Sequence, residues 1–398
     1  MSTVSSSPAP KAARRRHSFR DFWERVTEGI ELDVLGRQFL SEAKASYRLY
    51  SKDVDWDAVQ RARGPGKVVR TAFALFQAML MKLSPARRVL LLIAIGLLVF
   101  QPDFRWGDKA AASFHFGGVG VLILFILLAV ELADRVTMKR DLEIAREIQQ
   151  WLVPASAPKI DGIDIAFSTR PQNTVAGDYY DAFLRPIAPR SAAAPPLLVA
   201  VADVAGKSVP AALLMATFQA SLQALAITPV SLSEIVDGLD RYCRAYSLEG
   251  RRFTTAFLAE IDPRTREMHY VNAGHNDPIL RRASGAIERL SAGGPPFGLP
   301  SLTDAATPYA SGSVRLDAGD LLCIFTDGLV EAVNGADEEY REARLLACIE
   351  SARAEGSDAT LKRIMADVNA FVGPARQHDD ITCLVLCVTA RGNTPELS

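Results

Sequence analysis

Two long apolar runs set the strongest limit on how this chain of 398 residues can fold. Val89–Phe100 is an unbroken apolar run, and Phe114–Val130 is a longer one that only His115 and small glycines interrupt. A helix that crosses a bilayer needs about 20 apolar residues, so the first run alone could equally be a buried or re-entrant helix. A polar loop, 101–113, joins the two runs. Together they predict a transmembrane helical hairpin over residues 85–130.

Basic residues lie on both sides of this hairpin. Arg87 and Arg88 stand at its start, and Arg135, Lys139 and Arg140 follow it, whereas the connecting loop has two acidic and two basic residues. Positive charge collects on the cytoplasmic side of membrane proteins, so we expect both termini in the cytoplasm. The chain is then a multi-pass protein of the inner, cytoplasmic membrane, with everything after the hairpin in the cytoplasm.

The N-terminal region, residues 1–84, is basic. Residues 1–88 hold 17 Lys/Arg and 9 Asp/Glu, although the whole chain has a net charge of −1. Within 61–88 there is no acidic residue, and apolar side chains recur at helical spacing between Val69 and Leu83. This predicts an amphipathic helix, either at a membrane interface or in the core of a small soluble domain. The hairpin that follows favours the interface, so we expect membrane lipid as a partner and no nucleic acid.

Residues 131–155 predict a helix that continues out of the membrane and ends at Pro154. It carries an apolar stripe with steps of three and four residues, made of Met138, Leu142, Ala145, Ile148 and Leu152. Three heptads are too few to identify a coiled coil. A packed linker helix and the seam of a homodimer therefore both remain open.

From residue 156 to 390 the pattern changes to apolar runs of four to eight residues between turns that carry Gly or Asp. Such runs predict strands at Leu197–Ala202, Phe253–Ile261, Met268–Val271, Leu321–Phe325 and Ile381–Val388, with helices at 209–226, 232–247 and 358–372. Hairpin-like pairs of strands favour an α+β sandwich over a doubly wound parallel sheet. The five cysteines include no CxxC pair, which disfavours a disulfide framework and a zinc site.

Four aspartates recur in one setting, beside a strand and a tight turn: Asp178, Asp203, Asp327 and Asp379. Strand ends that meet at one rim of a sandwich would gather these carboxylates into a site with oxygen ligands only. Such a site suits Mg²⁺ or Mn²⁺ and not zinc. Two such ions that share one water can hydrolyse a phosphoester directly. Any one of these aspartates could instead be a turn or cap residue, and composition alone leaves the two interpretations balanced.

An ordered set of motifs then resembles a known family. The motifs are GDYYD (177–181), ADVAGKSVPAALLMA (202–216), FTTAFLAEID (253–262), YVNAGHNDPIL (270–280), GGPPFGL (293–299), FTDGLVEA (325–332) and DDIT (379–382). Across the C-terminal part that holds them, the chain resembles the SpoIIE/RsbU-type branch of the metal-dependent, type 2C-like protein phosphatases. The linker phrase AREIQQWLVP (145–154) belongs to the same resemblance, and residues 1–130 lie outside it.

The resemblance implies an αββα sandwich that binds two Mn²⁺ or Mg²⁺ ions over residues 156–390. By motif position, the implied metal ligands are Asp178, Asp203, Asp327, Asp379 and the backbone carbonyl of Val204. Asp203 would bridge the two ions and is the residue on which we expect catalysis to depend. The implied reaction is hydrolysis of phosphoserine or phosphothreonine in a regulatory protein. The family analogy further suggests an anti-anti-sigma-like, STAS-type substrate.

Three positions depart from the family pattern: Ala176 in place of Gly, Ser208 in place of Gly, and Asp277 where Pro is common. None of them removes a carboxylate. No clear equivalent of the phosphate-binding Arg of the eukaryotic branch exists, and Arg170 is a candidate by position only. Two other functions stay open: a catalytically idle adaptor with the same fold, and a membrane-tethered nucleotide cyclase. The intact aspartates disfavour the adaptor, and the missing purine-selecting Lys/Asp pair disfavours the cyclase.

Overall fold

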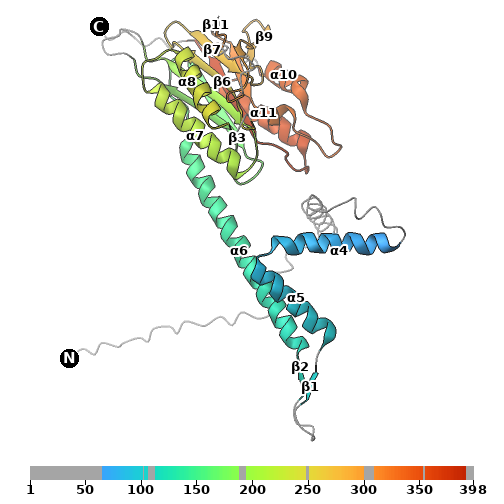
Figure 1. Ribbon diagram of the computed structural model, residues 1–398. Coiled ribbons are helices and arrows are strands. Elements are labelled where there is room, and N and C mark those ends of the chain that lie inside the picture. The colour runs from blue at the N-terminus through green and yellow to red at the C-terminus, as the bar shows by residue number, and fades with distance from the viewer. Residues whose placement is uncertain are drawn as a thin grey trace, which may run out of the picture. The chain divides into compact units, whose positions relative to one another are not determined.

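The computed structural model describes residues 65–101, 103–105, 113–187, 194–247, 251–299, 309–352 and 355–390 (Figure 1). Residues 1–64, which make up most of the basic N-terminal region, lie outside the described residues. The chain divides into two compact units, Met1–Arg135 and Val136–Ser398. Each unit is therefore described by itself.

The described part of the first unit is helical. It contains α4 (Pro65–Lys82), α5 (Pro85–Phe100), a short antiparallel pair of β1 (Asp103–Arg105) and β2 (Ser113–His115), and the beginning of α6 (Gly117–Leu152). Helix α4 forms where the basic amphipathic pattern predicts a helix. The second apolar helix begins later than the sequence suggests, because Phe114 and His115 belong to β2. The apolar stretch of α6 is therefore Gly117–Val130.

Helices α5 and α6 pack closely at one point. Ala94 is fully buried, and a Cβ added at Gly120 would lie 2.9 Å from the carbonyl oxygen of Ala94. Small residues permit such close approach of two helix backbones. At the other end of the pair, the Arg87 guanidinium donates hydrogen bonds to Glu131 (3.1 Å) and Asp134 (2.5 Å). This charged contact places the start of α5 beside the point where α6 becomes polar.

Length and composition single out α7 (Val209–Ala226) as the helix of the described part that is apolar enough to cross a membrane. Its residues Met215, Phe218 and Leu222 lie in the core of the second unit, so α7 is a helix of a folded domain. Helix α5 has 16 residues, fewer than a full span needs. The transmembrane hairpin therefore stays a prediction.

Two antiparallel sheets form the second unit. The first has the order β10-β7-β6-β5-β4, with β11 also pairing β7, and the second has the order β3-β13-β12-β8-β9. The strands of the first sheet are β4 (Tyr179–Leu184), β5 (Leu197–Val204), β6 (Thr254–Ile261), β7 (Glu267–Ala273), β10 (Gly293–Gly294) and β11 (Gly312–Arg315). Those of the second are β3 (Ile163–Arg170), β8 (Ile279–Arg281), β9 (Ile287–Arg289), β12 (Leu321–Phe325) and β13 (Ile381–Val388).

Helices cover the outer faces of both sheets, so the unit has four layers (Figure 1). Helices α7 and α8 (Leu232–Ala245) pack on the first sheet, and α10 (Arg341–Ser351) and α11 (Ser357–Val372) pack on the second. A third apolar cluster, with Val201, Phe257 and Leu384 among its members, lies between the two sheets. This αββα order is the expected α+β sandwich.

Helix α6 reaches this domain through Gln149. The side chain of Gln149 accepts a hydrogen bond from the Ala176 amide (2.9 Å) and donates one to the Ala176 carbonyl (2.7 Å). One side chain thus satisfies both backbone groups of a residue two positions before Asp178. The linker helix is therefore tied to the loop that carries the first of the four aspartates.

Candidate active site

Strand pairing brings the four aspartates together. Tyr179 pairs with Ala202, which places Asp178, just before β4, next to Asp203 near the end of β5. In the other sheet Phe325 pairs with Cys383, so Asp327, at the start of the short helix α9 (Asp327–Val330), lies at the same end as Asp379, whose charge acts on it. Each pair lies at one end of its sheet.

The electrostatics show that the two pairs share one site. Burial raises the pKa of Asp203 to about 7, and the negative charges of Asp327, Asp379 and Asp380 contribute to this rise. Burial first, and then Asp203, also raises the pKa of Asp178 well above its usual range. Burial and Asp379 raise the pKa of Asp327. Aspartates from both sheets therefore act on one another across the sandwich.

Two threonines that the sequence analysis did not single out position these carboxylates. The fully buried Thr326 hydroxyl donates a hydrogen bond to Asp178 Oδ2 at 2.9 Å and accepts one from the Thr382 amide at 3.0 Å. Thr326 immediately precedes Asp327, and Thr382 belongs to the DDIT motif. The two residues link the Asp178 loop to both strands of the opposite sheet. Their place in the two motifs is the signal that could have found them.

Asp380 holds the loop before Asp178. Its two carboxyl oxygens accept hydrogen bonds from the amides of Gln172 and Gly177, both at 2.6 Å. The alternation of side chains in DDIT places Asp380 opposite Asp379, and these bonds agree with a structural role. A Cβ at Gly328 would lie 2.0 Å from the Asp380 carbonyl oxygen, so only glycine fits after Asp327.

The loop after Asp203 has an unusual backbone. Val204, whose carbonyl is a predicted ligand, is buried at the end of β5. Gly206 and Ser208 then have φ angles of 128° and 64°, in the left-handed region that favours glycine. Ser208, which departs from the glycine of the family pattern, therefore occupies a position that needs positive φ. Helix α7 starts at the next residue.

The donor set fits a hard divalent cation. The cluster offers carboxylate oxygens and a carbonyl, which Mg²⁺ and Mn²⁺ prefer. Among the described residues, no group of three or more His, Cys, Asp or Glu side chains stands in ready metal-binding geometry. Burial and neighbouring carboxylates raise the pKa values of Asp178, Asp203 and Asp327, and a cation among them would relieve the repulsion.

Lys207 supplies one positive charge at the rim of the cluster. Its ammonium donates hydrogen bonds to Asp379 Oδ2 at 2.8 Å and to the His378 carbonyl at 2.7 Å. Lys207 and Asp379 line a cavity of about 230 Å³ together with Arg170, at the end of β3. The Arg170 guanidinium bonds Asn369, while its buried Nε has no partner among the described atoms.

His275 is a buried residue of the turn after β7. Its ring lies 3.0 Å from the Thr255 hydroxyl, and its backbone amide donates to Asn272. Burial lowers the pKa of His275 to about 4. We therefore assign it no catalytic role.

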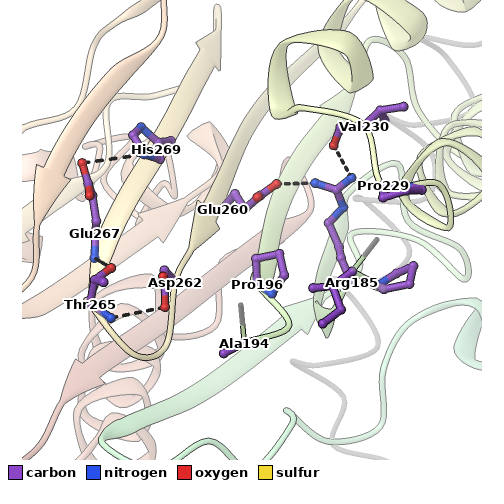
Figure 2. A pocket seen from close by; sticks show the side chains of 12 residues that line it. Arg185, Ala194, Pro196, Pro229, Val230, Glu260, Asp262, Thr265, Glu267 and His269 are labelled. Atoms are coloured by element: carbon purple, nitrogen blue, oxygen red, sulfur yellow. Dashed lines mark hydrogen bonds and ion pairs between the residues drawn. The ribbon is translucent and has the colours of Figure 1, made fainter. Parts of the chain in front are cut away.

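A larger cavity, about 390 Å³, lies elsewhere (Figure 2). It is lined by the far ends of β4 and β6 and has Arg185 in its wall. Arg185 is almost fully buried, and its guanidinium is satisfied by Glu260 and by the carbonyls of Ala226, Thr228 and Val230. This cation is therefore structural.

Residues 195–389 match the model of the family described as Stage II sporulation protein E (SpoIIE). The phosphoserine phosphatase RsbU of Bacillus subtilis is 27% identical over 252 residues, which cover 63% of this chain and 70% of RsbU. Protein IcfG of Synechocystis is 26% identical over 330 residues, or 74% of this chain. The chain spans about half of IcfG, 49% of its length.

A solved structure, the SiaA-PP2C domain of Pseudomonas aeruginosa, is 21% identical and superposes with a TM-score of 0.53. The match covers 64% of this chain and 98% of that domain. At this identity the likeness concerns the fold, and it supports the αββα arrangement of the second unit. The segment that matches the family model contains Asp203, Asp327 and Asp379. Residues 195–389 of the C-terminal unit thus match the SpoIIE family model, and the unit shares the fold of the SiaA-PP2C domain.

Proposed function

We propose that this chain is a metal-dependent protein serine/threonine phosphatase that is anchored in the inner, cytoplasmic membrane. The observation that carries the proposal is the shared electrostatic field of Asp178, Asp203, Asp327 and Asp379 at one end of the sandwich. The sequence similarity to RsbU, a phosphoserine phosphatase, supports a phosphorylated serine or threonine as the substrate.

In this proposal Asp178, Asp203, Asp327, Asp379 and the Val204 carbonyl hold two Mn²⁺ or Mg²⁺ ions. Bound ions of this kind supply an activated water for direct hydrolysis of a phosphoester. Asp203 would bridge the pair, because its pKa responds to Asp178 in its own sheet and to Asp327 and Asp379 beside the other sheet. Thr326 fixes the orientation of Asp178 through the 2.9 Å hydrogen bond, and Asp380 fixes the preceding loop. Neither Thr326 nor Asp380 needs to touch the substrate.

The membrane anchor in this proposal is the hairpin of α5 and the apolar start of α6. Large apolar side chains are exposed along both helices, among them Leu92, Val99, Phe125 and Leu128. Such a continuous apolar surface is rare on a soluble protein. Exposed Phe73 and Met81 on α4 support the same assignment, in which α4 lies at the lipid interface.

The substrate in this proposal is a phosphorylated regulator of the STAS, anti-anti-sigma type. Its support is the similarity to RsbU together with the family resemblance of seven ordered motifs. A homodimer through the stripe of α6 is part of the same proposal. Met138 and Ile148 of that stripe are exposed within the second unit, so they are free to meet a second copy.

The deciding experiment is Mn²⁺-dependent release of phosphate from a phosphoserine peptide by the full chain in detergent. Wild-type protein should release phosphate, and Asp203→Asn should not. An Asp237→Asn change on the exposed side of α8 serves as the matched control. Mn²⁺ binding without hydrolysis of any phosphoester would favour the idle adaptor instead.

A further inference from the structure

Lys207 is placed among the carboxylates in a way that the phosphatase proposal does not use. Its loop connects Asp203 to α7, and its ammonium contacts the carboxylate of Asp379 and the carbonyl of His378. Its charge also acts on Asp327 and Glu331. The charge of one lysine therefore acts on three of the acidic groups at this rim, and its ammonium contacts one of them.

The two oxygens that Lys207 binds belong to neighbouring residues, His378 and Asp379. One of them, Asp379 Oδ2, belongs to a carboxylate that the phosphatase proposal gives to a divalent cation. An ammonium 2.8 Å from one oxygen of this carboxylate repels a metal ion bound to the same carboxylate at about 2.1 Å, so each cation weakens the binding of the other. Lys207 is about half exposed, so its side chain has room to swing away.

We propose that Lys207 is a tethered cation that competes with the divalent metal for Asp379. The inference rests on the phosphatase proposal for the identity of the ligand set. In the metal-free protein the ammonium stabilises Asp379 among its acidic neighbours. When a metal binds, the ammonium leaves this carboxylate, and the remaining repulsion between the two cations weakens metal binding. Lys207 thus sets how much metal the protein needs before the site at Asp379 fills.

The size of the effect follows from Coulomb's law. A single charge about 5 Å from a divalent ion in a water-like dielectric changes the affinity by roughly tenfold. The partly exposed position of Lys207 makes the water-like value the appropriate one. Removing the charge should therefore tighten binding at one of the two metal positions by about tenfold. The position that does not involve Asp379 should change less.

The test measures Mn²⁺ binding to the full chain in detergent, by the electron paramagnetic resonance signal of free Mn²⁺. Lys207→Met keeps the length of the side chain and removes the charge, and Lys207→Arg keeps the charge. Lys362→Met removes an exposed charge that pairs with Asp358 on α11 and is the matched control. We expect about tenfold tighter binding at one of the two positions for Lys207→Met, and wild-type affinity at both positions for Lys207→Arg and Lys362→Met.

Thermal unfolding gives a second readout, in which Lys207→Met lowers the stability of the metal-free protein although it tightens metal binding. Without metal, Lys207→Met should melt below wild type because the carboxylates lose a counter-ion, and added Mn²⁺ should raise its melting temperature by more. Unchanged or weaker Mn²⁺ binding by Lys207→Met would overturn the inference about Lys207. The phosphatase proposal would stand in that case if the wild-type protein hydrolyses a phosphoester. A wild-type protein that neither binds Mn²⁺ nor hydrolyses a phosphoester would overturn both.

Discussion

Asp203→Asn in the metal-free protein gives the sharpest test of the aspartate cluster, because it measures stability and not activity. Burial and the charges of Asp327, Asp379 and Asp380 raise the pKa of Asp203 to about 7, against an ordinary value of 3.8. A carboxyl whose folded pKa is raised stabilises the fold below its unfolded pKa. This contribution is lost as pH rises from about 3.8 to about 7.

The magnitude follows from the size of the shift. Each pKa unit corresponds to about 1.4 kcal/mol, so ionised Asp203 costs the metal-free fold on the order of 4 kcal/mol at pH 8. Asparagine has a similar shape and no charge, so Asp203→Asn does not incur this cost. The variant should therefore unfold at a higher urea concentration than wild type at pH 8. Near pH 4 the difference should shrink, because Asp203 is then protonated in the wild type.

The assay is urea unfolding of the full chain in detergent with a chelator, followed by circular dichroism between pH 4 and 8. The diagnostic quantity is how the stability difference between Asp203→Asn and wild type changes with pH, because loss of an acceptor oxygen would shift stability equally at every pH. Asp237→Asn, on the exposed side of α8, controls for a general charge effect. Parallel pH profiles for wild type and Asp203→Asn would refute the shared field of the four aspartates. Added Mn²⁺ should stabilise the wild type and leave Asp203→Asn much less affected.

With Mn²⁺ present, Asp203→Asn should lower the rate of phosphoester hydrolysis by at least a few orders of magnitude while the fold persists, and near-normal turnover would contradict a bridging role. Burial lowers the pKa of His275 to about 4, so the free energy of unfolding is unaffected by this residue above about pH 6.5 and falls by up to about 3 kcal/mol as the pH is lowered towards 4. In His275→Gln the stability measured by urea unfolding should therefore depend less on pH over this range. A single cysteine introduced at Asp237, with the native cysteines replaced, should resist labelling by a membrane-impermeant reagent on intact cells, and labelling there would contradict the hairpin. The double change Leu142→Asp and Ile148→Asp should alter the Mn²⁺ dependence of hydrolysis and shift the chain towards monomer in detergent. If neither property changes, the linker helix has no regulatory role and only connects the two units.

Helix and strand positions in the C-terminal half could be predicted because the apolar pattern is local. The expected helix 209–226 is Val209–Ala226, and the expected strands Leu321–Phe325 and Ile381–Val388 have those bounds in the structure. Each is long or strongly apolar, so its period is clear from the sequence. The short strands β8–β11 were missed, since two to four residues carry too little pattern, and α10, with 11 residues, was also missed.

The sequence by itself determined which residues could do chemistry, because four aspartates beside strands and turns are visible without a fold. Alternation along a strand also places Asp178 and Asp181, three residues apart, on opposite faces of the sheet. In the structure Asp181 bonds Tyr179 and Gln223, away from the cluster.

Only the tertiary structure decided which groups position those aspartates and act on them. Thr326 lies 148 residues from Asp178 along the chain, Lys207 lies 172 residues from Asp379, and Gln149 reaches Ala176 from another helix. Such pairs depend on how two sheets and a linker helix pack, and no local pattern encodes that packing. The charge of Asp203 is likewise a tertiary property, because burial and three distant carboxylates together set its pKa.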